Sequence, residues 1–153
     1  MADAGDLKSL FRKEVRVRSP PLARIPSMPP VPFDRLLSLA SGEVGRVVSE
    51  MPPELRRRAG EVPVRYAERV ARHWLDDGVE PDSLGLFSGP SLRDEDAAHS
   101  DEPPLVTLFL RNLWDWCEGD EGAYLDEVAR TYLHEFGHYL GLGEDGMAAR
   151  DLD

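Results

Sequence analysis

The 153-residue chain has one cysteine, no long apolar run and few basic residues. The single cysteine, Cys117, excludes an internal disulfide and fits a reducing cytosol. No apolar run approaches the roughly 18 residues that a membrane span needs, and no apolar segment resembles the core of a secretory signal. We therefore expect a cytoplasmic protein with no membrane-spanning segment and no membrane partner.

Basic side chains are outnumbered: 18 Lys and Arg stand against 29 Asp and Glu, for a net charge of −11. Residues 1–32 carry six basic and three acidic side chains, whereas residues 33–153 carry twelve and twenty-six. An acidic body repels nucleic-acid backbones and anionic membranes, so its composition does not favour nucleic acid as a partner. The basic segment 1–32 can contact nucleic acid or lipid, and the alternative is an extension without a function of its own.

Prolines divide the chain into two parts. Residues 20–32 contain six prolines, which exclude regular secondary structure there. We expect residues 1–32 to be a disordered, basic, proline-rich extension. Residues 33–153 are long enough for one domain with a hydrophobic core.

Apolar periodicity in residues 33–153 predicts a mixture of helices and strands. The strongest strand signal is a continuous apolar run that follows two prolines, and the last helix begins after Asp120, a suitable N-cap residue. The expected elements are helices at 33–50, 53–59 and from 120 onward, strands near 61–67, at 84–87 and at 105–110, a polar loop at 88–104 and an amphipathic turn at 112–117.

The most informative stretch, residues 131–144, contains the pattern H-E-x-x-H. His134 and His138 are four residues apart, so on a helix both rings lie on one face and can bind one ion. Imidazoles suit Zn²⁺ at about 2.0–2.1 Å, and a catalytic zinc takes three protein ligands and keeps one position open. Glu135 lies beside the pair, where it can act as general base on a metal-activated water.

The third ligand is expected from the residues after the helix. Gly141 accepts the left-handed conformation that commonly ends a helix, and a turn there would bring Glu144 toward the metal. This spacing matches the pattern H-E-x-x-H-x-x-G-x-x-(H or acid) of metzincin-type sites. Asp145 is the alternative third ligand, and the spacing favours Glu144.

The two histidines lie away from the apolar face of their helix, which distinguishes them from core histidines. The apolar stripe at helical spacing consists of Leu125, Val128, Ala129, Tyr132, Leu133, Phe136 and Leu140. His73 and His99 stand alone and are read as ordinary surface histidines. Cys117 could be a ligand or a nucleophile, but a buried small apolar residue is the favoured interpretation.

These residues resemble a family of small bacterial zincin-like metallopeptidases, the minimal zincins. Segments 84–89, 108–115 and 127–135 are similar to family segments in the same order, and the resemblance covers about residues 33–153. It implies a compact single α+β domain, with helices packed on a small sheet and a zinc site on the last long helix. By resemblance His134, His138 and Glu144 are metal ligands, Glu135 is the general base, and strand 105–110 is an edge strand that pairs with an extended peptide.

Two functions from different classes follow from this reading. The leading hypothesis is zinc-dependent peptide hydrolysis, with a peptide or protein as substrate. The alternative is a non-catalytic zinc-binding module that binds a peptide or partner or has a regulatory role. Met147 follows Glu144 more closely than the methionine turn of metzincins, so we expect one wall of the usual protease cleft to be missing. Tyr139 and Tyr132 are the nearest donors for an anionic intermediate, and neither is well placed.

Overall fold

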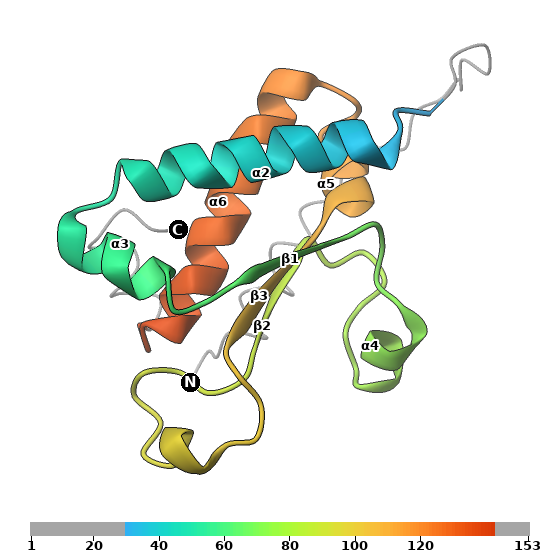
Figure 1. Cartoon of the computed structure of the whole chain (residues 1–153). Helices are drawn as coiled ribbons and strands as arrows, with labels where there is room; N and C mark the ends of the chain where they lie inside the picture. The colour runs from blue at the N-terminus through green and yellow to red at the C-terminus, as the bar shows by residue number, and fades with distance from the viewer. Residues whose placement is uncertain (1–29, 143–153) are drawn as a thin grey trace.

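A computed structural model of the protein describes residues 30–142. The described residues form an α+β domain whose helices pack on a small sheet, as the sequence predicts (Figure 1). In chain order the elements are α2 (Phe33–Ser49), α3 (Pro53–Ala59), β1 (Val64–Ala67), α4 (Arg72–Asp76), β2 (Gly85–Ser88), the 3₁₀ turn η1 (Ala97–His99), β3 (Leu105–Phe109), α5 (Leu110–Trp116) and α6 (Glu121–Tyr139). Within residues 30–142, no helix is both long and apolar enough to cross a membrane.

Within residues 30–142 the sheet has three strands, in the order β1-β3-β2. β3 pairs in parallel with β1 and antiparallel with β2. The prediction that strand 105–110 is an edge strand is therefore wrong, because both sides of β3 are already hydrogen-bonded to neighbours. Its continuous apolar run reflects burial in the centre of the sheet, and among the described residues β1 and β2 form the edges.

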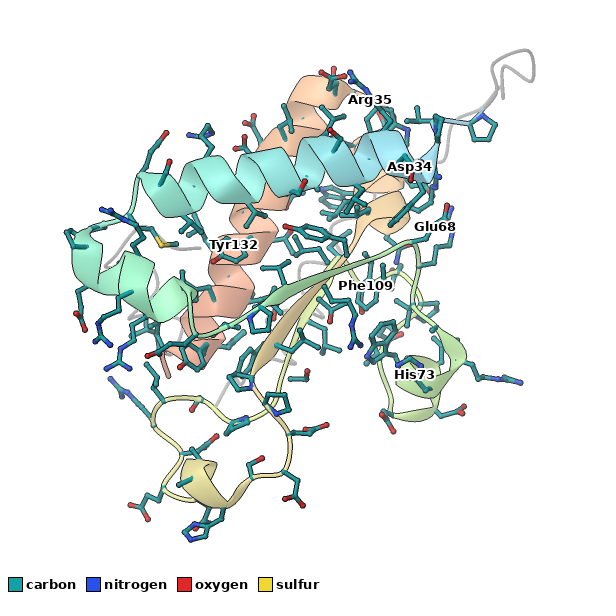
Figure 2. The ribbon with its side chains drawn as sticks, in the orientation of Figure 1. Asp34, Arg35, Glu68, His73, Phe109 and Tyr132 are labelled. Atoms are coloured by element: carbon teal, nitrogen blue, oxygen red, sulfur yellow. The ribbon has the colours of Figure 1, made fainter. Side chains whose placement is uncertain are left out.

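Helix α6 packs on one face of the sheet, against β2 and β3, and α2 crosses α6 (Figure 1). Tyr124 of α6 is fully buried, and its hydroxyl donates to the carbonyl oxygen of Leu36 in α2 at 2.9 Å. Tyr132, labelled in Figure 2, is also buried and stacks on Phe136 one turn later. The apolar stripe expected on α6 is thus the surface that joins this helix to α2 and to the sheet.

The opposite face of the sheet carries a smaller aromatic contact. The ring of Phe109 in β3 meets the ring of Trp74 in α4 edge-on, with the ring centroids 5.2 Å apart. The ring of His73 packs on the same Trp74, with the centroids 4.3 Å apart. Figure 2 labels Phe109 and His73. In Figure 1, α4 lies at the far end of the domain from the C-terminal end of α6. His73 therefore belongs to a separate part of the molecule from the paired histidines.

One short segment differs from the expectation. Residues 110–116 form a helix, α5, where a strand end and a turn were expected. Leu110 and Leu113 are fully buried and Cys117 nearly so, which is the spacing of one helical face. The buried position of Cys117 agrees with its interpretation as a small core residue.

Both ends of α6 show the local chemistry that the sequence predicts. The carboxylate of Asp120 accepts from the backbone N–H of Ala123 at 2.8 Å, so Asp120 is the N-cap. At the other end Gly141 has a φ of 76°. The N–H of Gly141 donates to the carbonyl of His138 at 3.0 Å, and that of Leu142 to the carbonyl of Gly137 at 3.1 Å. This pair of bonds is a Schellman motif, which ends the helix directly after the histidines.

The N-cap gives a prediction about stability. Replacing Asp120 with Ala leaves the N–H of Ala123 without its acceptor, so the free energy of unfolding should fall by about 1 kcal/mol. Urea unfolding followed by circular dichroism measures this change. Asp126→Ala is the control, because it removes the same charge from an exposed position inside the same helix. Equal losses in the two variants would contradict a capping role.

Candidate functional site

The two histidines of the motif lie side by side on α6. Both side chains are half-buried, and their rings meet at 89° with centroids 4.8 Å apart. The Nε2 atoms of His134 and His138 are 3.3 Å apart. The helix therefore turns the same nitrogen of each ring toward one point.

This separation fits a single tetrahedral zinc ion. Two ligand atoms at about 2.0–2.1 Å from zinc, with a tetrahedral angle between them, are roughly 3.3–3.4 Å apart. The distance between the two nitrogens is thus that of two ligands of one such ion. The roles of His134 and His138 as ligands remain a prediction that this geometry supports.

Glu135 lies between the histidines in sequence, and its side chain points toward the sheet. It is 2% exposed, and Glu127 and Thr131 on the preceding turns are also buried. The indole N–H of Trp116 donates to the carboxylate of Glu127 at 3.2 Å. The polar face of α6 is therefore packed against its neighbours rather than solvated, which places the candidate base in a dry environment.

The structure adds Gly85 of β2 to the site. A Cβ atom built on this glycine would lie 3.3 Å from Cγ of Glu135 and 2.6 Å from Cγ2 of Thr131. β2 is an edge strand, so the candidate base lies where α6 meets the edge of the sheet. Sequence reasoning did not single out Gly85, although a glycine inside an apolar strand signals close approach of another element.

The predicted third ligand, Glu144, and its alternative, Asp145, lie outside the described residues. Within residues 30–142, no cluster of three or more His, Cys, Asp or Glu side chains is arranged to hold a metal ion. The Schellman motif at Gly141 changes the direction of the chain three residues after His138. A turn at this position is what the prediction for Glu144 requires.

The loop between β2 and β3 docks on the end of α6. The N–H of Leu92 donates to the carbonyl of Tyr139 at 2.8 Å. The aliphatic part of Arg93 covers Gly141, where any added Cβ would collide with it. His99 is exposed on η1 of this loop. The loop thus supports the helix end that carries His138.

Neither tyrosine near the motif is available as a donor to an anionic intermediate. The hydroxyl of Tyr139 donates to the carboxylate of Glu61 at 2.7 Å. Burial, together with this bond, raises the pKa of Tyr139 to about 12, and the bond lowers the pKa of Glu61. Tyr132 is 2% exposed in the core, and burial raises its pKa to about 12.

Comparison with known families agrees with this geometry. A family model described as zincin-like metallopeptidase matches residues 59–153. The match covers more than half of the chain and includes the strands, the helix with both histidines and Glu144. The protein therefore belongs to the zincin-like metallopeptidases, a family that implies zinc as a cofactor and peptides or proteins as substrates in general. None of the curated proteins searched matches the chain.

The bond between Tyr139 and Glu61 gives a prediction with a pH dependence. Tyr139→Phe should lower the free energy of unfolding at pH 7 by about 1 kcal/mol, the usual net value of a hydrogen bond. Because the pKa of Tyr139 is raised, the contribution is complete below about pH 10, the ordinary tyrosine pKa. It is lost as the pH rises through about 12.

Urea unfolding of wild type and Tyr139→Phe at pH 7, 10 and 12 tests this. Tyr66→Phe is the control for the loss at pH 7, because this half-buried phenol makes no side-chain hydrogen bond within the described residues. If wild type is still more stable than Tyr139→Phe by the same amount at pH 12, the stabilising role of the hydrogen bond to Glu61 is contradicted.

The histidine geometry predicts zinc content. Wild type purified without added metal should contain about one zinc per chain, as measured by elemental mass spectrometry. His138→Ala should lose the ion, and Glu144→Ala should bind it more weakly. His99→Ala, on the loop, is the matched control and should keep wild-type content. If wild type stays metal-free after zinc is added back, the H-E-x-x-H sequence of this helix does not form a zinc site.

Proposed function

We propose that the protein is a zinc-dependent peptidase, in which His134, His138 and Glu144 hold the metal and Glu135 is the general base. The observation that carries this proposal is the 3.3 Å separation of the two histidine Nε2 atoms, with the buried Glu135 on the adjoining face of α6. Family membership supports it at the level of the reaction class.

The mechanism depends on Glu135. Zinc, when bound, supplies a Lewis acid that lowers the pKa of water and polarises the scissile carbonyl. Glu135 accepts the proton of the attacking water and later delivers it to the leaving amine. Because Glu135 is 2% exposed, its carboxylate works in a medium of low dielectric, where its electrostatic effect on the reacting groups is larger than in water.

The substrate would bind along β2. β3 is central and its backbone is fully paired, whereas β2 is an edge strand and lies against α6. A peptide that adds to β2 by backbone pairing would pass beside Gly85 and hence beside Glu135. The peptide-binding strand is therefore expected at 85–88 and not at 105–110.

The rival proposal is a non-catalytic zinc-binding module for a peptide or partner. One observation favours it: Tyr132 and Tyr139, the two donors considered for the anionic intermediate, are committed to the core and to Glu61. A site of this kind would stabilise the fold through its metal without turnover. It would not need an acid such as Glu135 beside the histidine pair.

Glu135→Gln separates the two functions. The variant should keep wild-type zinc content and lose at least about 10²-fold in kcat, because proton transfer by a positioned base contributes that much. Cleavage of a peptide library by the zinc-loaded protein, read by mass spectrometry, measures it. Glu121→Gln is the control, since Glu121 is exposed on the first turn of the same helix. Equal turnover by Glu135→Gln and wild type would disprove the base assignment.

A further inference from the structure

Gly85 is a point of close contact between β2 and α6. A Cβ atom built on it would lie 2.6 Å from Cγ2 of Thr131, 3.3 Å from Cγ of Glu135 and 3.3 Å from the carbonyl oxygen of Thr107. Cβ atoms in real proteins essentially never come within 3.0 Å of a heavy atom outside their own residue and its chain neighbours. The strand can reach this distance from the helix only because residue 85 has no side chain.

Space, not backbone conformation, requires the glycine. Gly85 is absent from the glycines with positive φ, and it sits in regular antiparallel register opposite Leu108, which is fully buried. A glycine in the middle of a strand costs roughly 0.5–1 kcal/mol of stability relative to alanine, and Gly85 is the first residue of β2. The close contact with α6 is the local feature that calls for a glycine here.

The contact involves the aliphatic part of the Glu135 side chain, the candidate base. Glu135 is 2% exposed, and its Cγ faces the space that a side chain at position 85 would fill. Thr131, one turn earlier, lies against the same space. A larger residue would therefore push β2 away from α6, displace the stem of Glu135, or do both.

We propose that Gly85 is a positioning residue for Glu135. Its missing side chain sets the distance between the edge strand and α6, and this distance fixes where the carboxylate of Glu135 stands relative to the two histidines. Because the metal ligands lie on α6, the same spacing would also set how far a peptide paired with β2 lies from the metal. The inference rests on the proposed function, because it assigns Gly85 a part in the chemistry at that site.

The test is a pair of substitutions that creates and then relieves the collision. Gly85→Ala adds the Cβ, and Thr131→Ser removes Cγ2, the atom that would meet it at 2.6 Å, while keeping the hydroxyl. Gly85→Ala should keep its zinc and its KM within about twofold, and lose on the order of 10²-fold in kcat, as expected for a displaced catalytic group. The double variant should recover at least about tenfold of that loss.

A second readout does not depend on turnover. Acetohydroxamate chelates zinc through its two oxygens, and its hydroxyl proton can be accepted by a neighbouring carboxylate. Calorimetric titration of the zinc-loaded full chain should give about tenfold weaker binding for Gly85→Ala, with wild-type affinity restored in the double variant. Gly45→Ala is the control, since a Cβ at Gly45 on α2 meets nothing within 4 Å.

The outcomes separate the two proposals. Unchanged acetohydroxamate affinity in a zinc-loaded Gly85→Ala overturns the positioning role, and so does a double variant no better than the single one. If Gly85→Ala does not fold, the double variant decides: wild-type affinity supports the role, and weak affinity or failure to fold overturns it. A wild type that binds zinc and shows this pattern but cleaves no peptide would overturn the peptidase and leave the positioning role standing.

Discussion

The packing of α6 against the sheet and α2 is the interaction on which the rest of the structure depends. One side of this helix buries Tyr124, Val128 and Phe136, each fully, and the other side carries the paired histidines. Burial of large apolar side chains is the main favourable term in folding. The same packing that stabilises the domain therefore fixes the rotation of α6 about its axis, and with it the direction in which His134 and His138 point.

Much of this arrangement was predictable from the sequence because the strongest signals are local. The 3.6-residue period of the apolar stripe, the N-cap at Asp120 and the glycine at 141 each depend on residues within one or two turns. The histidine pair is likewise a local feature, since residues four apart on a helix must be neighbours. The helices at 33–49 and 53–59 and the strand regions followed from the same kind of pattern.

The relations between distant segments were not predictable in the same way. The apolar run at 105–109 indicates a buried strand, but a buried run does not tell whether the strand has one neighbour or two. The order β1-β3-β2 placed it in the centre and moved the edge to β2. The contact of Gly85 with Thr131 and Glu135 joins residues about fifty positions apart, so neither segment announces it alone.

The hydrogen bond from Leu92 to the carbonyl of Tyr139 ties an exposed loop to the helix that bears the histidines. Opening of this loop at Leu92 must break a bond that the last turn of α6 accepts, so the loop and the end of the helix are coupled through this contact. A ligand that binds only the closed form makes such openings rarer in proportion to its affinity. An ion that holds the end of α6 by binding His134 and His138 would therefore slow amide exchange at Leu92. Leu92 is more than forty residues away in the sequence and has no side-chain atom that binds a metal.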